Sequence, residues 1–180
     1  MDGFWEGVQY YNEQKGTNVQ VLGWDEMNQK GGTFANSFTD ANKGKQITQQ
    51  FQQQGADVVF PVAGGTGVGS AAAAAASGGQ LSVIWVDTDG CQSVAQYCKY
   101  FLTSVTKNLT GSVQEYVNQA ASGDFPKGNY VGTLENDGTG LAPFHDFDSQ
   151  VSDELKSELD QVKADIISGA IEITSPSQPQ

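Results

Sequence analysis

A glycine turn and a pair of carboxylates follow two neighbouring apolar segments, each at the point where its segment ends. The first segment runs into Phe60-Pro-Val-Ala-Gly-Gly-Thr-Gly-Val-Gly69, and the second into Ile84-Trp-Val-Asp-Thr-Asp89. Backbone N–H groups of a glycine turn and carboxylate oxygens together suit the polar groups of a small molecule. We therefore expect ligand binding here, and the candidate residues are Gly64, Gly65, Thr66, Gly67, Asp87 and Asp89.

An aromatic residue and a lysine add to this pattern. Phe38 lies beyond a polar loop over residues 25–36, and Lys107 follows an apolar segment over residues 101–105. An aromatic ring, free N–H groups, a carboxylate and a lysine fit a planar, hydroxylated, uncharged ligand. Each residue also has a structural explanation, because Phe38 could staple a helix, the carboxylates could cap the next turn and Lys107 could be a solvated helix residue.

The glycine spacing supports a second interpretation. Gly67-x-Gly69-x-x-Ala72 matches the dinucleotide fingerprint, and Asp87 follows Gly67 by 20 positions at the end of the next predicted strand. That context would place a pyrophosphate at a helix start and a ribose on the carboxylate, as in an NAD-dependent oxidoreductase. The lone His145 lies far along the chain, and no G-x-S-x-G elbow, P-loop lysine or recognised metal-ligand spacing is present. These features predict a binding protein rather than an enzyme, with no cofactor and no metal.

The net charge of the chain limits which classes of ligand it can bind. The chain of 180 residues has a net charge of −12, and all nine basic residues are lysines. Nucleic-acid binding needs clustered basic residues, and multiply charged phosphates usually recruit arginine forks, so both partners are disfavoured. Cys91 and Cys98 could close a small disulfide in an exported protein or remain two free thiols.

The elements that must position these residues alternate between strands and helices. The spacing of apolar residues predicts helices over residues 3–14, 40–54, 68–77, 108–122 and 149–168. Apolar runs predict strands over residues 19–24, 56–62, 81–86, 130–134 and 171–173, and residues 101–105 form a short strand or a helix entry. Strands separated by helices imply an α/β fold, with a mostly parallel sheet flanked by helices. Consecutive strand ends share one edge of such a sheet, which would bring the candidate residues together.

Four blocks of the chain carry a family resemblance. They are Ser37-Phe-Thr-Asp-Ala-Asn-Lys-Gly-Lys45, residues 54–67, Val86-Asp-Thr-Asp89 and Leu102-Thr-Ser-Val-Thr-Lys107. In these blocks the chain resembles the basic membrane protein family, the purine nucleoside-binding lipoproteins of bacterial ABC importers. The resemblance implies a Rossmann-like lobe of a type I periplasmic-binding-protein fold, corresponding to the second half of the family's two-lobed proteins.

The resemblance also implies roles for the candidate residues. Phe38 would stack on the base, and the turn from Gly64 to Gly67 would offer backbone contacts. Asp87, with Asp89 as its neighbour in the motif, would bind ribose hydroxyls, and Lys107 would reach the ligand from the opposite wall.

Expectations about organisation and location follow from the same resemblance. Residues 1–134 would form the C-terminal lobe, residues 135–174 a crossover segment with a last helix and strand, and residues 175–180 a disordered tail. Expected partners are a nucleoside, ABC permease subunits and a missing N-terminal lobe, in a precursor that is lipid-anchored outside the cytoplasm. One lobe alone should bind nucleoside weakly and self-associate. The alternatives are a dinucleotide-binding module of an oxidoreductase and a nucleoside-sensing regulatory protein.

Overall fold

A four-stranded, mostly parallel sheet organises the chain in the computed structural model, which describes residues 1–125 and 127–177. The strands are β1 (Val58–Val59), β2 (Ser82–Asp87), β3 (Phe101–Lys107) and β4 (Thr139–Leu141), and they lie in that order across the sheet. The first three strands are parallel, and β4 runs antiparallel to β3. The predicted α/β fold is therefore confirmed, and the segment at residues 101–105 is a strand.

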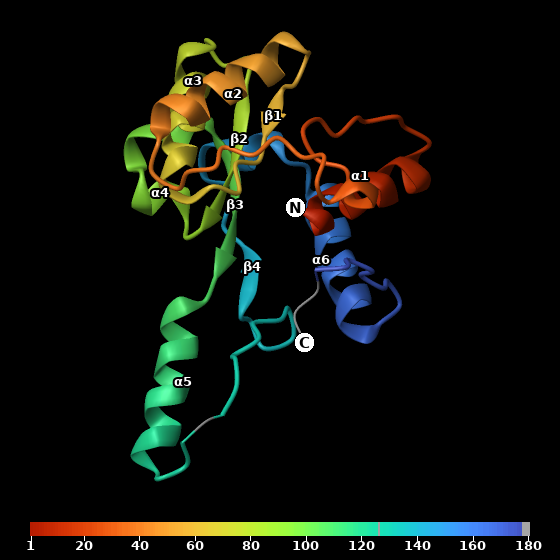
Figure 1. The fold of residues 1–180 in the computed structure, drawn as a ribbon. Helices are drawn as coiled ribbons and strands as arrows, with labels where there is room; N and C mark the ends of the chain where they lie inside the picture. The colour runs from red at the N-terminus through yellow and green to blue at the C-terminus, as the bar shows by residue number, and fades with distance from the viewer. Residues whose placement is uncertain (126, 178–180) are drawn as a thin grey trace.

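Helices pack around the upper part of this sheet or extend away from it (Figure 1). The α-helices are α1 (Asp2–Lys15), α2 (Ala41–Gln53), α3 (Gly67–Ala76), α4 (Gly90–Ser93), α5 (Leu109–Ala121) and α6 (Asp153–Ser168). Short 3-10 helices are η1 (Glu26–Asn28), η2 (Gly64–Thr66), η3 (Ala95–Tyr100) and η4 (His145–Gln150). Side chains cap α2, α5 and α6 as expected of Asp, Asn and Ser, since Asp40, Asn108 and Ser152 each accept an N–H of the first turn. None of the helices in the described ranges is both long and apolar enough to cross a membrane.

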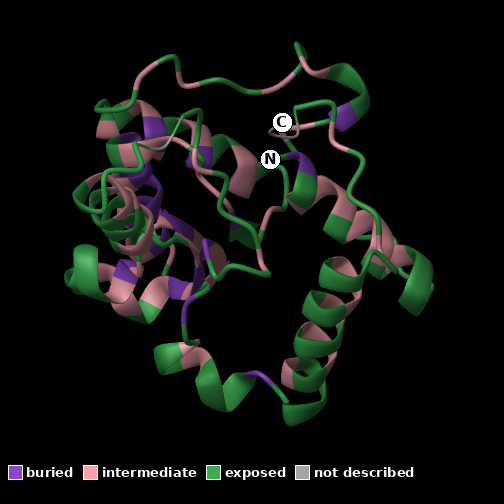
Figure 2. Cartoon of the chain, turned by 90° about the horizontal axis from the view of Figure 1, so that it is seen from below, coloured by how far each residue is buried: buried purple, intermediate pink, exposed green. Residues whose placement is uncertain are grey.

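The core lies between α3 and the strands. Ala71 and Ala74 are fully buried, so the alanine run lets α3 approach β2 closely. The rings of Trp85 and Phe101 pack with their centroids 5.3 Å apart, joining β2 to β3. Figure 2 shows the buried residues gathered at the strands and the helices packed on them, whereas most other segments are intermediate or exposed.

Two glycines allow α2 and α3 to touch. A Cβ atom on Gly69 would collide with the backbone oxygen of Ala41, and one on Gly44 would collide with the backbone oxygen of Thr66. Gly67 is less crowded, since a Cβ atom there would lie 3.2 Å from the ring of Trp85, which is a tight contact and not a collision. Close packing therefore accounts for the Gly67-x-Gly69 spacing without a pyrophosphate.

Three predicted strands are wrong, and local hydrogen bonds explain why. The backbone of Val19, in the segment at residues 19–24, bonds to the Asn12 side chain and not to β1. In the segment at residues 130–134, the Asn136 side chain takes up backbone groups of Val131 and Thr133. The segment at residues 171–173 follows the left-handed cap at Gly169 and folds back onto the end of α6. Side chains of this type compete with the ladder for backbone groups.

Strand β1 is shorter than the predicted segment at residues 56–62. It pairs with β2 only at Val58 and Val59. Pro61 lacks an N–H to donate, and Gly64 has a φ of 55°, so the chain turns away from the sheet soon after β1. The antiparallel strand β4 was not predicted, because Thr-Gly-Leu is short and carries a glycine.

The end of the described chain lies against α1. Ser175 donates a hydrogen bond to Asp2 at 2.5 Å, and Thr174 donates two to Glu6. The hydrogen bond from Ser175 is the largest cause that lowers the pKa of Asp2. The predicted tail at residues 175–180 thus begins with hydrogen-bonded residues, and residues 178–180 lie outside the described ranges.

Three carboxylates crowd together at this contact, and one of them supplies a stability test. Burial, with Glu6 and Asp2 nearby, raises the pKa of Glu26. Because the folded state holds this proton more tightly than the unfolded state, stability falls as pH rises from the ordinary glutamate pKa through the raised value. We expect Glu26→Gln to raise the melting temperature by roughly a few degrees at pH 7, and the gain to shrink as pH falls.

The matched control for this prediction is Glu13→Gln, on the exposed face of α1. Thermal melts from pH 4 to pH 7 should show no comparable gain for the control. Equal melting temperatures of the Glu26→Gln variant and the parent chain at pH 7 would contradict the prediction.

Candidate ligand-binding site

Asp87 and Lys107 meet at the carboxyl edge of the sheet. Asp87 ends β2, and its Cα pairs in register with Thr106 of β3, so Lys107 is the next residue along. The Lys107 ammonium lies 2.6 Å from Oδ1 of Asp87, and the two side chains are 65% and 43% exposed. Within the described ranges the other carboxylate oxygen of Asp87 has no hydrogen-bond partner, so it can still accept hydrogen bonds from a ligand.

The backbone at Asp87 is held in an unusual conformation. Its φ is 71°, and the N–H of Thr88 donates to the carbonyl of Val86 at 2.8 Å, which makes Asp87 the centre of a γ-turn with positive φ. Such turns are rare and strained for a residue with a side chain, and this strain costs about 1–3 kcal/mol. Strain of this kind clusters at functional sites, which favours a ligand role for Asp87 over a simple cap.

A cavity of about 780 Å³ opens beside this pair. Its walls are the ends of β2 and β3, the strand β4 and one face of α6. The α6 wall consists of the apolar residues Leu159, Val162 and Ile166 together with the charged residues Asp160 and Lys163. The charged and amide side chains of the lining are those of Asp87, Asp89, Lys107, Asn108, Asp137, Asp160 and Lys163, and three threonines, Thr88, Thr106 and Thr139, complete its polar part. The volume falls in the range that holds small molecules, about 300–1,000 Å³.

Several lining residues were not predicted from the sequence. Asn108 lies next to Lys107, but its side-chain oxygen accepts the Gly111 N–H at the start of α5. Asp137 lies in the turn before β4 and Lys163 lies in α6, and the Lys163 ammonium is 3.4 Å from Oδ1 of Asp137. The apolar stripe of α6 was visible in the sequence, whereas its position opposite the strand ends depends on the fold.

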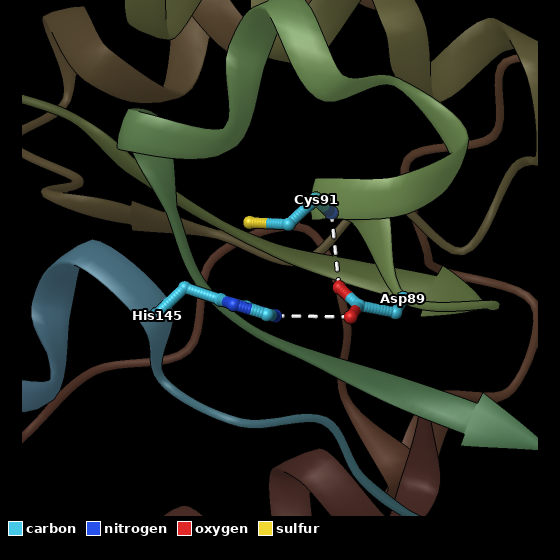
Figure 3. Close-up of side chains that lie close together, drawn as sticks. All are labelled: Asp89, Cys91 and His145. Carbon is cyan, nitrogen blue, oxygen red and sulfur yellow. Dashed lines mark hydrogen bonds and ion pairs between the residues drawn. The ribbon is translucent and has the colours of Figure 1, made fainter.

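Asp89 lines the same cavity but has a structural task. One carboxylate oxygen accepts the Cys91 N–H at 2.9 Å, which caps α4, and the other lies 2.9 Å from Nε2 of His145 (Figure 3). The side chain is only 13% exposed. Asp89 therefore has fewer free acceptor sites than Asp87.

Phe38 and the glycine turn form a separate cluster after β1. Phe38 is 77% exposed and its ring lies next to Gly64, and the Phe38 carbonyl accepts the Thr66 N–H at 3.1 Å. Thr66 is buried and its hydroxyl donates to the Ser37 carbonyl, so it holds the Phe38 loop to the turn. Phe38, Gly64, Gly65, Thr66 and Gly67 do not line the cavity beside Asp87. Their contact with a ligand stays a prediction.

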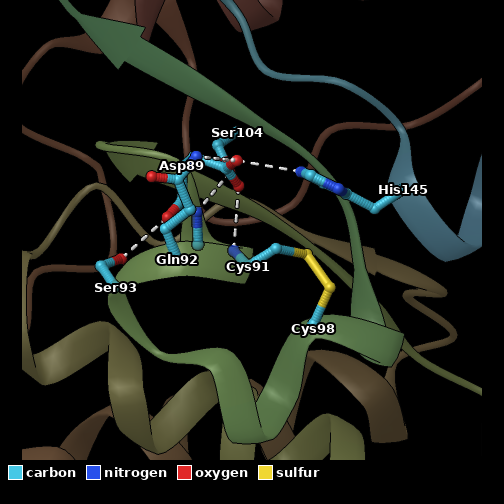
Figure 4. The surroundings of a disulfide bond; sticks show 8 residues. Asp89, Cys91, Gln92, Ser93, Cys98, Ser104 and His145 are labelled. Carbon is cyan, nitrogen blue, oxygen red and sulfur yellow. Dashed lines mark hydrogen bonds and ion pairs between the residues drawn. A yellow bond between two sulfur atoms is a disulfide. The ribbon is translucent and has the colours of Figure 1, made fainter.

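The two cysteines form a disulfide beside this edge (Figure 4). Cys91 lies in the first turn of α4 and Cys98 in η3, with their Cα atoms 4.4 Å apart. The bridge closes the loop that follows Asp89, and it resolves the open alternative in favour of a disulfide.

Comparison with known proteins places this geometry in a family. The model of the family described as ABC transporter substrate-binding protein PnrA-like matches residues 1–177. A CD4+ T-cell-stimulating antigen of Listeria monocytogenes is 30% identical over 189 residues, which cover 98% of this chain and 48% of that protein. The ABC transporter nucleoside-binding protein BmpA of Lactococcus lactis is 32% identical over 156 residues, which cover 79% of this chain and 43% of that protein.

A solved structure agrees with these relatives. A solute-binding protein of an ABC transporter system from Aeropyrum pernix K1 superposes with a TM-score of 0.80 at 25% identity, covering 98% of this chain and 54% of that protein. The fold is thus that of a solute-binding-protein lobe, and the chain spans about half the length of the curated relatives it matches. The resemblance predicted from the four sequence blocks is confirmed. The chain therefore belongs to the PnrA-like family of ABC transporter substrate-binding proteins.

Proposed function

We propose that this chain is one lobe of an ABC-importer solute-binding protein that holds a purine nucleoside between two lobes. The observation that carries the proposal is the Asp87 carboxylate, which is presented into a cavity by a strained turn and keeps one oxygen free. A carboxylate in this position can accept the two hydroxyl hydrogens of a ribose. The Lactococcus relative is named as nucleoside-binding, which supports the same ligand class.

The opposite wall would come from a second lobe. Helix α5 extends away from the sheet (Figure 1), and Leu109, Val113 and Val117 recur at four-residue steps along it. Their exposed fractions are 56%, 63% and 60%, so this stripe is not covered within the described ranges. The relatives are about twice as long as this chain, and the half that the chain does not match is the natural partner for the stripe.

Phe38 would supply the base contact. Its exposed ring packs beside Gly64, in the turn that follows β1, and β1 ends toward the same edge of the sheet as β2 because these two strands are parallel. Flat aromatic faces bind purine rings by stacking. We place the protein outside the cytoplasm, anchored by lipid, and in contact with permease subunits, and the disulfide between Cys91 and Cys98 supports an oxidising compartment.

Calorimetry on the two-lobed protein tests this proposal. Guanosine, adenosine or inosine should bind at least tenfold more tightly than the matching monophosphate. The reason is electrostatic: the chain carries a net charge of −12, it has no arginine fork, and the ammonium of Lys107 is already paired with Asp87.

The 180-residue chain alone serves as the comparison. It should bind nucleoside far more weakly, because the ligand contacts of a single lobe must offset the full entropic cost of association, about 4–15 kcal/mol. Tighter binding of a monophosphate or of NAD to the two-lobed protein would contradict the proposal and favour the dinucleotide interpretation.

A further inference from the structure

Asp89, Cys91 and His145 bring one ligand atom each into a single cluster. The carboxylate oxygen, the sulfur and the imidazole nitrogen lie within 4.8 Å of one another (Figure 3). Cys98 adds a second sulfur, since it is bonded to Cys91 (Figure 4). Three separate elements contribute these groups, so the sequence spacing alone did not reveal the cluster.

The backbone conformation of His145 directs its ring toward Asp89. Its φ is 46°, in the left-handed region that side chains other than Asn, Asp and His rarely adopt. From there Nε2 reaches Oδ2 of Asp89 at 2.9 Å, while Oδ1 of Asp89 is fixed by the Cys91 N–H. A carboxylate held by a backbone N–H is a preorganised ligand.

We propose that the dithiol form of this chain binds one Zn²⁺ through the thiolates of Cys91 and Cys98, Nε2 of His145 and the carboxylate of Asp89. Zn²⁺ prefers four tetrahedral ligands of this kind, at about 2.3 Å for sulfur and about 2.0–2.2 Å for nitrogen and oxygen. Two tetrahedral nitrogen and oxygen ligands at these distances lie about 3.3–3.6 Å apart. Nε2 and Oδ2 lie 2.9 Å apart, so they need to separate only slightly to hold the ion. The ion replaces the proton that these two atoms share.

The disulfide controls access to this site. While the bond is closed, neither sulfur is a thiolate, and only two of the four ligands remain. A dithiol reductant opens the bond by thiol–disulfide exchange: its two sulfurs become a disulfide, and Cys91 and Cys98 each take up one proton. Zn²⁺ then displaces these protons. A disulfide oxidant reverses the step by the same exchange: Cys91 and Cys98 are oxidised to their disulfide, the oxidant takes up two electrons and two protons to become two thiols, and the ion is released.

This site lies beside the candidate ligand site but is a separate proposal. Asp89 belongs to both the cluster and the lining of the cavity, two residues from Asp87. Zinc binding does not depend on which solute the protein carries, so its test stands even if the nucleoside assignment fails.

The test compares zinc affinity in the two redox forms of the 180-residue chain. A trialkylphosphine reduces the disulfide: the phosphorus takes an oxygen from water to become the phosphine oxide, and the sulfurs take the protons. After the phosphine is removed without air, competition with a chromophoric zinc chelator should show one tight site. We expect affinity at least 100-fold above that of the disulfide form, with proton release on binding. Co²⁺ should give a thiolate charge-transfer band and the intense visible bands of tetrahedral coordination.

Two conservative variants test the ligand set. Asp89→Asn keeps the helix cap and His145→Asn keeps a residue that tolerates positive φ, yet each should weaken zinc binding in the dithiol form by at least tenfold. Asp146→Asn, an exposed neighbour of His145, is the matched control and should change nothing. Circular dichroism shows whether each variant is folded.

Three results would overturn the proposal. One is equal zinc affinity in the dithiol and disulfide forms, which would indicate a surface carboxylate site. Another is unchanged affinity in both Asn variants, which would leave chelation by the two thiols alone. The last is a dithiol chain that unfolds and is not refolded by zinc.

Discussion

Gly69→Ala is expected to lower the free energy of unfolding by about 3 kcal/mol, the largest stability loss that we expect from a single methyl group in this chain. The new Cβ would collide with the backbone oxygen of Ala41 and stand 2.6 Å from the backbone nitrogen of Lys45. Both obstacles are backbone atoms of α2, so no side chain can rotate to make room, and α2 must move away from α3. For a chain of this size the melting temperature should fall by about 6–12 °C.

Gly7→Ala is the matched control, because Gly7 is an exposed helix position with open space around its missing Cβ. That change should stabilise the chain by about 0.5–1 kcal/mol through better helix propensity. Urea unfolding of both variants separates the two effects. If Gly69→Ala cost no more than about 0.5 kcal/mol, the glycine would not be needed for packing, and a role in binding an anion at the start of α3 would regain support.

The parts of the fold that follow local rules could be predicted from the sequence. Helix α3 is an alanine run behind a glycine turn, and β2 is an apolar run that both neighbours and α3 cover. The wrong strands looked equally apolar. Polar side chains prevented two of these segments from pairing as strands. The Asn12 side chain binds the backbone of Val19, and the Asn136 side chain organises the turn before β4. Propensity does not encode such side-chain partners.

The same division applies to the candidate site. Asp87 and Lys107 were predicted because parallel strand ends must meet, and the structure joins them. The cavity wall from α6 and the approach of His145 to Asp89 depend on how η4 and α6 return to the sheet. The spacing of residues along the sequence does not predict where η4 and α6 pack against the sheet. Phe38 was predicted from an aromatic residue near a strand end, and its ring does stand exposed beside Gly64.

Asp87→Asn should weaken nucleoside binding to the two-lobed protein by at least tenfold. A hydrogen bond to a charged group contributes about 1.5–3 kcal/mol, and about 1.4 kcal/mol corresponds to a factor of ten. Asparagine is the informative replacement, because it tolerates the φ of 71° that would strain alanine. It also leaves Lys107 without its carboxylate partner, so a ligand would face an uncompensated ammonium.

The stability of the unliganded protein should hardly change in this variant. The pair of Asp87 and Lys107 is largely exposed, and such pairs contribute about 0–1 kcal/mol. Asp148→Asn is the matched control, since Asp148 forms a similar exposed pair with Lys156 at 2.8 Å but lies outside the cavity. Calorimetry should show unchanged nucleoside affinity for this control. A lowered melting temperature together with unchanged affinity in Asp87→Asn would make Asp87 a structural residue, and the strained turn would then serve the fold and not the ligand.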